Sequence, residues 1–529
     1  MIHLNAVELL VTFLLFFVSG LWNVQGREGE FEPIEKICDR CKCSLHKEFT
    51  SSEQDKFLSY SVLDCSTKNL RHMLAEWPEE FAQDLKPGQE LVFSLSGNDI
   101  HSLQQLPATE ADLVFSCRHC NLSELASGLF LDTPNIVRLD LSWNRLSGDV
   151  LTPDVFRGPY NDEVYEPLAL DELDLSNNLI SYLDGSLFEH MAHLRSLSLS
   201  KNPLEKITPD TTLALGSIRR LEHLDLSYTG IDELPRGVFD KIDGLKELYL
   251  QGNHFKAVPS AIALLKPTLK ILNIGDNPIQ MLNDESFFDL DRLTHLNISM
   301  MENLEDIIIG TFSGLKSLEV LVCSNNPSLM TFDMSDLKGL VRLRQLDLSN
   351  CGLQHLHLDE PIPIIDHNSD IAQFEVFQKL RSVNLEGNPW HCDCDLYKTI
   401  ESFKHILEDE FHGPATSPSN EARCESPYDL AALPLTDLGP LSLCNSPPKK
   451  VPKIPIYEAP AFLRPRSIML SLLSVGIVLL IGFVIGFAIV CIKRRLQKAD
   501  FGFTSPVRYT TVRDSTTSNI LQQQQQQHV

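Results

Sequence analysis

A repeated spacing of leucines constrains the fold of this chain more than any other feature. Residues 194–204 read Leu-x-x-Leu-x-Leu-x-x-Asn-x-Leu, and the pattern recurs through most of the sequence. The position of the asparagine, here called the asparagine slot, falls at residues 98, 120, 144, 178, 202, 229, 253, 277, 301, 326, 351 and 388. Most steps between slots are 22 to 27 residues, and 24 is the commonest. A period of this length predicts a stacked repeat architecture.

The spacing also predicts how each copy folds. Side chains alternate along a strand, so both leucines of Leu-x-Leu point inward and the residue between them points outward. The asparagine slot points inward at the end of the strand, where its amide can bond backbone groups of the neighbouring coil. One coil cannot bury its leucines alone, so we expect a curved solenoid with a parallel sheet on the concave side. The aromatic residues predicted to fill the convex side are Phe130, Phe156, Phe188, Phe239, Phe287 and Phe312.

These repeats resemble those of extracellular leucine-rich-repeat proteins, and the resemblance covers about two thirds of the chain. It implies an α/β horseshoe with about twelve repeats between residues 89 and 388. It also implies a disulfide-closed cap at each end, over residues 27–88 and 389–445. A cap is needed because a terminal coil would otherwise expose its leucines to water.

Eight of the thirteen cysteines lie in the expected caps. Sequence alone allows three connectivities for each set of four. The pairs that the family resemblance implies are Cys38 with Cys43, Cys41 with Cys65, Cys392 with Cys424, and Cys394 with Cys444. In the second cap the resemblance also implies that Trp390 covers the last coil.

Four further cysteines lie inside repeats. Cys117 and Cys323 occupy the second inward leucine position, and Cys120 and Cys351 occupy the asparagine slot. Repeat phase therefore predicts four small, buried residues, and we expect all four thiols to be reduced. This interpretation is favoured over a zinc or redox motif at Cys117-x-x-Cys120.

The two ends of the chain predict a membrane protein. Residues 1–26 are typical of a signal peptide, with cleavage favoured after Gly26 and Gly20 as the alternative, and secretion permits disulfides. Residues 446–467 are a proline-rich linker, and residues 468–492 are 25 residues without a charge, long enough to cross a bilayer. The basic run Lys493–Arg495 places the C-terminus in the cytoplasm. The tail, residues 493–529, is short, polar and expected to be disordered.

The expected membrane helix carries two further candidates. Gly482 and Gly486 form a G-x-x-x-G match that could pair two helices into a homodimer, or the glycines are simply tolerated in an apolar helix. Cys491 at the cytoplasmic edge is a candidate for palmitoylation.

Two repeats carry insertions. The 34-residue step contains the acidic segment Asn161–Glu166, and the 37-residue step contains Asp359–Asp366. Insertions in solenoids map to loops on one face, which is either a functional face or a tolerated surface.

No catalytic motif is present: the sequence has no P-loop, no G-x-S-x-G and no H-E-x-x-H. We therefore expect no enzyme, no cofactor and no metal site. The formal net charge of −26 argues against a nucleic-acid partner.

The resemblance implies a single-pass type I protein of the plasma membrane that binds an extracellular protein ligand in cell adhesion or as a co-receptor. Two alternatives stay open. The chain could be a signalling receptor, for instance in innate immunity, that borrows a partner's cytoplasmic domain, or it could be a structural organiser of membrane or matrix.

Glycosylation sequons and outward side chains suggest where a ligand binds. The sequons begin at Asn121 and Asn297, and Asn297 faces out of the sheet, where a glycan would cover the C-terminal half. The outward positions proposed for binding are Asp140, Trp143, Asp174, Asp225, Tyr228 and Tyr249. Our hypothesis centres the ligand on the three aromatics, with the aspartates favouring a basic partner. The alternative is that these rings stack on strands of their own sheet.

Overall fold

The computed structural model describes residues 37–50, 57–358, 379–402, 404, 407, 422–439 and 444. The chain divides into two units, Met1–Asn445 and Ser446–Val529, and every described residue lies in the first. The predicted signal peptide, linker, membrane run and tail, with Gly482, Gly486 and Cys491, lie outside the described residues, as does the insertion Asp359–Asp366. Among the residues that are described, no helix has the length and apolar composition needed to cross a bilayer.

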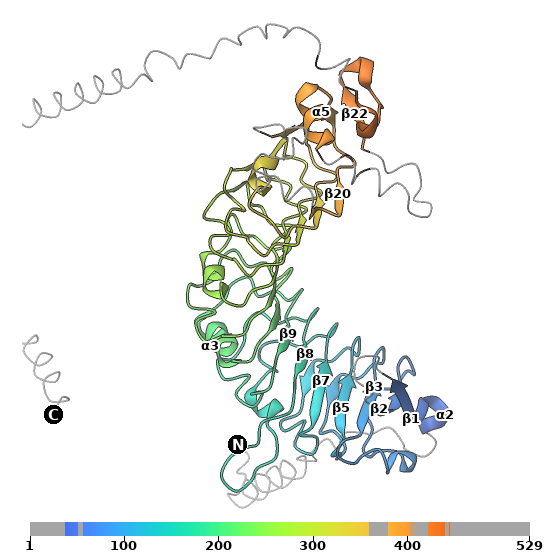
Figure 1. Cartoon of the computed structure of the whole chain (residues 1–529). Helices are drawn as coiled ribbons and strands as arrows, with labels where there is room; N and C mark the ends of the chain where they lie inside the picture. The colour runs from blue at the N-terminus through green and yellow to red at the C-terminus, as the bar shows by residue number, and fades with distance from the viewer. Residues whose placement is uncertain are drawn as a thin grey trace, which may run out of the picture. The chain divides into compact units, whose positions relative to one another are not determined.

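A 14-stranded sheet runs along the inner side of the stacked coils and confirms the predicted solenoid (Figure 1). Its strands follow one another in chain order, and all neighbours are parallel except the first pair, β1 and β2. The strands are β1 Lys42–Thr50, β2 Phe57–Asp64, β3 Glu90–Ser94, β5 Asp112–Ser116, β7 Ile136–Asp140, β8 Glu172–Asp174, β9 Ser196–Ser198, β10 His223–Asp225, β11 Glu247–Tyr249, β12 Ile271–Asn273, β14 His295–Asn297, β16 Val320–Val322, β18 Gln345–Asp347 and β20 Ser382–Asn384.

Short elements form the return half of the coils and the two ends. Two-stranded pairs join β4 Ser102–Leu103 to β6 Glu124–Leu125, β13 Met281–Leu282 to β15 Asp306–Ile307, β17 Thr331–Asp333 to β19 His355–His357, and β21 Trp390–His391 to β22 Cys424–Ser426. The α-helices are α2 Ile37–Arg40, α3 Pro209–Ser217 and α5 Cys394–Glu401. The 3₁₀ turns are η1 Glu79–Phe81, η2 Pro153–Phe156, η3 Ser260–Leu265, η4 Met334–Leu337, η6 Tyr428–Leu430 and η7 Leu435–Asp437.

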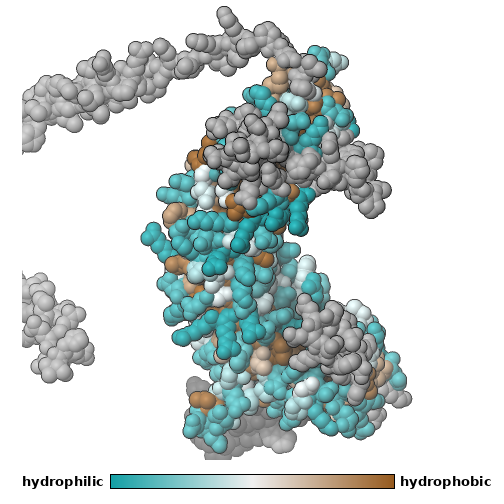
Figure 2. Space-filling view, viewed as in Figure 1, coloured by the Kyte–Doolittle hydropathy of each residue, from teal (hydrophilic) through white to brown (hydrophobic). Residues whose placement is uncertain are grey.

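The core is continuous through the stack, as the leucine pattern predicts. Equivalent leucines of successive coils lie opposite one another, for example Leu224 and Leu248 in β10 and β11, and both are buried. The six predicted phenylalanines are all buried, and Phe130 stacks on Phe156 with ring centroids 5.9 Å apart. The side of the coils seen in Figure 2 is mostly hydrophilic, with hydrophobic side chains in scattered patches. Burial of the repeated apolar positions therefore holds the coils together.

The asparagine slot links neighbouring coils, as predicted. Asn144 Nδ2 donates to the carbonyl oxygen of Cys117 in the preceding coil at 2.8 Å and to that of Leu141 in its own coil at 2.9 Å. Its Oδ1 accepts from the backbone N–H groups of Cys120 and Leu122. One buried amide thus satisfies four backbone groups that face the interior, where an unpaired polar group is costly.

The disulfides correct one prediction. The bonds at the two ends match the pairs that the family resemblance implied, Cys38–Cys43, Cys41–Cys65, Cys392–Cys424 and Cys394–Cys444. However, Cys117 and Cys120 also form a disulfide, so the prediction of reduced thiols is wrong for this pair. The reason lies in the turn after the strand, which brings the slot close to the leucine position three residues earlier. In the next coil the same proximity lets the side chain of Asn144 reach Leu141.

Cys323 and Cys351 are free and buried, as predicted. The Cys351 Sγ occupies the slot and donates to the carbonyl oxygen of Cys323 at 3.1 Å, much as an asparagine would. Burial raises the pKa of Cys351 to about 11 and that of Cys323 well above its usual range. Both thiols are therefore neutral at physiological pH.

Candidate ligand-binding face

One position of every coil lies at the rim of the sheet, directly before the asparagine slot. We call these residues the rim column. All twelve adopt a positive φ, because the chain turns sharply off the strand at this point. The column consists of Gly97, His119, Trp143, Asn177, Lys201, Tyr228, Gly252, Asp276, Met300, Asn325, Asn350 and Gly387.

Trp143 and Tyr228 are the unexpected members of the rim column. The left-handed conformation costs an L-residue about 1–2 kcal/mol and is easiest for glycine and asparagine. These two aromatics nevertheless adopt φ of 57° and 55°. Full burial of the rings does not offset this conformational cost, since the two residues remain 40% and 42% exposed. The repeat geometry imposes this conformation on all twelve positions, so what distinguishes Trp143 and Tyr228 is that large, partly exposed rings occupy it.

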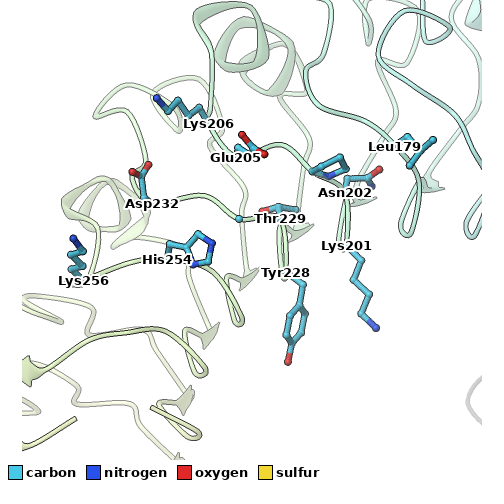
Figure 3. A pocket seen from close by; sticks show the side chains of 12 residues that line it. Leu179, Lys201, Asn202, Glu205, Lys206, Tyr228, Thr229, Asp232, His254 and Lys256 are labelled. Atoms are coloured by element: carbon cyan, nitrogen blue, oxygen red, sulfur yellow. The ribbon is translucent and has the colours of Figure 1, made fainter. Parts of the chain in front are cut away.

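A cation lies beside each ring. Trp143 stacks on His119 with centroids 4.9 Å apart, and the Arg118 Cζ lies 5.7 Å from its centroid. Lys201 Nζ lies 6.0 Å from the Trp143 ring and 5.7 Å from the Tyr228 ring, so this ammonium group connects the two aromatics. Figure 3 shows Lys201 and Tyr228 extending in the same direction from adjacent coils, whereas Lys206 extends the other way. The structure thus brings two of the three predicted aromatics into one cluster.

Tyr228 also packs on its own sheet, which is the alternative that the sequence left open. A Cβ atom on Gly252, the next residue of the rim column, would overlap the Tyr228 ring. Partial burial, together with the charge and hydrogen bond of Asp276, raises the pKa of Tyr228. Stacking and exposure coexist here, because one face of the ring covers Gly252 while the side chain stays partly open to solvent.

Tyr249 lies on the sheet itself and differs from the other two aromatics. Its ring tilts against His223 at 5.1 Å, and its hydroxyl donates to Glu247 Oε2 at 3.2 Å. The same carboxylate oxygen lies 2.9 Å from His223 Nδ1. Burial and the neighbouring Glu247 charge raise the pKa of Tyr249 to about 12. Tyr249 is therefore engaged within a polar cluster of β10 and β11 and is not part of the rim column.

The three predicted aspartates have a role in the fold that sequence analysis missed. In each, Oδ1 accepts from the backbone N–H of a buried serine two residues later: Ser142 for Asp140, Ser176 for Asp174 and Ser227 for Asp225. These bonds stabilise the turn from the strand into the rim column. Burial additionally raises the pKa of Asp174. One oxygen of each carboxylate thus already accepts a hydrogen bond, so fewer acceptor positions remain for a basic partner.

A hollow of about 920 Å³ opens beside the rim column, in the loops that follow β9, β10 and β11 (Figure 3). The lining combines rim-column and slot residues with loop residues of successive coils, and the repeat pattern does not specify the identity of those loop residues. Its lining includes Lys201, Lys206, Lys256, Glu205 and Asp232. Within the described part of the chain, no group of three or more His, Cys, Asp or Glu residues could hold a metal ion.

Both glycosylation candidates lie at partly exposed positions. Asn297 is in β14, two strands beyond β11 in the sheet order, and its Oδ1 accepts from the backbone N–H and hydroxyl of Ser299. Asn121 directly follows the slot of its coil, and its Nδ2 lies 3.1 Å from Asp99 Oδ1. A glycan on either asparagine remains a prediction.

Comparisons with known proteins agree with this architecture. A family profile described as "Leucine rich repeat" matches residues 169–222 and 301–353. Tsukushi of Mus musculus is 32% identical over 280 residues, covering 48% of this chain and 74% of that protein. Transforming growth factor beta activator LRRC32 of Mus musculus is 28% identical over 368 residues, covering 58% of this chain and 55% of that protein.

Among solved structures, the octameric complex of Latrophilin 3, Unc5D and FLRT2 contains a similar chain. It is 18% identical, covers 73% of this chain and 97% of that chain, and has a TM-score of 0.38. The stacked parallel strands, the asparagine slots and the match to Tsukushi lead to one conclusion. The chain belongs to the leucine-rich-repeat family.

Proposed function

We propose that this chain is a cell-surface protein whose ectodomain binds an extracellular protein ligand at the rim cluster, defined as Arg118, His119, Trp143, Lys201 and Tyr228. The observation that carries the proposal is the pair of exposed aromatics held with positive φ. Large aromatics and arginine are the residues that contribute most to protein interfaces. Their rings are already oriented by cations and by Gly252, so little side-chain freedom would be lost on binding.

The chemistry of the cysteines and the composition of two apolar segments support an extracellular location. Disulfides at both ends and within the repeats favour an oxidising compartment. The apolar core Val11–Val18 within residues 1–26 and the uncharged residues 468–492 support secretion and a single-pass type I anchor in the plasma membrane.

The proposed role is adhesion or co-receptor function, not catalysis. One relative is named as an activator of transforming growth factor beta. By that analogy, the ligand of this chain is a protein outside the cell.

Surface cross-linking on intact cells tests the proposal. The full chain is expressed, bound proteins are cross-linked, and the captured proteins are identified by mass spectrometry. We expect at least one extracellular protein to be captured by the wild type and lost from a Trp143→Ala, Tyr228→Ala variant that reaches the surface at the same level. Tyr428→Ala is the matched control, because Tyr428 is 93% exposed and belongs to the C-terminal region instead of the rim cluster.

Two further variants refine the site. Asn297→Gln should leave the captured ligand bound, because Asn297 lies on the sheet several coils away from the rim cluster. Tyr249→Phe should weaken binding less than Tyr228→Ala, since it keeps the ring and removes only the bond to Glu247. An unchanged set of captured proteins in the double variant would move the ligand site to the insertions or to the convex face.

A further inference from the structure

The acidic insertion forms a small hairpin on the surface. Tyr160 and Tyr165 face each other as an antiparallel bridge. Asn161 N–H donates to the Val164 carbonyl oxygen at 3.1 Å, and Glu166 N–H donates to that of Pro159 at 2.8 Å. At its base, a Cβ atom on Gly158 would overlap the Glu166 carbonyl oxygen, so the two arms meet closely there. The insertion is therefore a shaped projection with a four-residue turn.

The hairpin exposes an acidic stretch around a tyrosine. Residues 160–167 are all exposed, and Tyr160 and Tyr165 retain 57% and 40% of their accessible surface. Carboxylates lie three and two residues before Tyr165, at Asp162 and Glu163, and directly after it, at Glu166. Tyr165 thus lies within a local cluster of negative charge on a segment that an enzyme could reach.

The contacts of Tyr165 involve its ring and not its hydroxyl. The Arg157 Cζ lies 5.4 Å from the ring centroid, and the His190 ring approaches at 5.8 Å. Among the described residues, the Tyr165 hydroxyl makes no hydrogen bond. By contrast, the Tyr160 hydroxyl donates to the Asp162 carbonyl oxygen at 3.1 Å, and the Tyr182 hydroxyl donates to the Asp149 carboxylate. Tyr165 therefore combines a positioned ring with an available phenolic oxygen.

We propose that Tyr165 is a site of tyrosine O-sulfation. A tyrosine that is exposed, flanked by carboxylates and outside the packed repeats is the kind of acceptor that a tyrosine sulfotransferase of the secretory pathway can bind through basic residues. The phenolic oxygen of Tyr165 attacks the sulfur of a phosphoadenylyl sulfate donor. The new O–S bond forms as the S–O bond to the donor phosphate breaks, and the transferase takes the phenolic proton. The products are tyrosine O-sulfate and the adenosine bisphosphate.

The modification would change the charge of the hairpin. A sulfate ester is ionised at every physiological pH and adds a negative charge to Asp162, Glu163 and Glu166. Because this inference concerns the hairpin and not the rim cluster, it does not depend on where the ligand binds. It does rest on the extracellular location in the proposed function, since the donor and the transferase are supplied along the secretory route.

Metabolic labelling of the full chain tests the site. Mammalian cells that express the protein are grown with radioactive sulfate, the chain is purified, and its N-glycans are removed enzymatically. We expect the label to remain on the wild type and to fall to background in Tyr165→Phe. Tyr160→Phe is the matched control and should keep the label, because it removes the neighbouring exposed tyrosine. A Glu163→Gln, Glu166→Gln variant should lose most of the label while keeping the acceptor hydroxyl.

Surface biotinylation of the same cells separates the possible failures. An unlabelled wild-type chain at the cell surface would overturn the sulfation, and label that persists in Tyr165→Phe would overturn the assignment to this residue. A chain absent from both the surface and the medium would overturn the extracellular location, and with it both proposals. Equal surface levels of the three variants exclude misfolding as the cause of a lost signal.

Discussion

Single residues of the rim column determine which side chains are exposed at the edge of the sheet. Gly252 is the clearest case, because its missing side chain makes room for the Tyr228 ring and its φ of +68° suits glycine. The repeat pattern does not specify which residue fills this position, since asparagine, lysine and tryptophan also occur there. The rings at Trp143 and Tyr228 therefore depend on their particular neighbours.

We predict that Gly252→Ala destabilises the protein by about 1–2 kcal/mol through its left-handed backbone alone. Displacement of the Tyr228 ring should add to this loss and weaken ligand capture. The measurement is the thermal unfolding midpoint of the secreted ectodomain. Gly339→Ala is the control, because nothing lies within 4 Å of a Cβ atom built there. Equal midpoints for the two variants would contradict the packing described for Tyr228.

The free thiols predict a dependence of stability on alkaline pH. Burial raises the pKa of Cys351 from 9.0 to about 11, so the unfolded chain loses this proton at lower pH than the folded chain. The contribution of the protonated Cys351 thiol to folding stability is fully present below pH 9 and declines as pH rises toward 11. The wild type should therefore lose stability in this range more steeply than Cys351→Ala, as measured by chemical denaturation at a series of pH values. Parallel pH profiles would argue against a buried neutral thiol.

At the scale of elements, the disulfides differ in what they hold together. Cys394–Cys444 joins α5 to a residue 50 positions later, whereas Cys117–Cys120 spans only three positions within one turn. In the chain-entropy account, a disulfide stabilises more when it closes a longer loop. The two disulfides should therefore contribute unequally to the free energy of unfolding, although both lie in the same structural unit.

We predict that a Cys394→Ala, Cys444→Ala variant loses much more surface expression than Cys117→Ala, Cys120→Ala. Removal of a native disulfide from a secreted domain typically costs about 2–5 kcal/mol of stability. A disulfide that closes a short loop stabilises the protein least, because closing a short loop removes little entropy from the unfolded chain. Quantitative flow cytometry with an N-terminal epitope tag placed after residue 26 measures the difference. Cys323→Ala, which removes a free thiol, provides the reference. Equal expression of the two double variants would contradict this ranking.

At the scale of the whole molecule, the proposed orientation places the repeats outside the cell and residues 493–529 inside. A C-terminal epitope tag should be detected only after permeabilisation, while an antibody to the repeats should stain intact cells. The positive residues Lys493–Arg495 are the physical reason, since basic residues that flank a membrane segment stay in the cytoplasm. Detection of the C-terminal tag on intact cells would reverse the orientation.

Much of the fold could be predicted from the sequence alone. The alternation of side chains along a strand and the 24-residue period are local properties, so the leucine positions predict the buried face of every coil. The same reasoning placed the amide of Asn144 inside the stack, and a second apolar mark predicted the interior position of Phe130, which is buried against Phe156. In the candidate site, Trp143 and Tyr228 were expected to face outward, and both are partly exposed at the rim of the sheet.

Only the tertiary structure decided which of these residues meet. Tyr249 is drawn into a cluster with Glu247 of its own strand and His223 of the adjacent one, although its position in the pattern matches that of the aspartates. Cys117 and Cys120 bond because the strand-end turn brings their positions together, which linear spacing does not reveal. The physical reason is general: a pattern determines the direction of each side chain, whereas distances depend on backbone torsion angles and on the neighbouring coil.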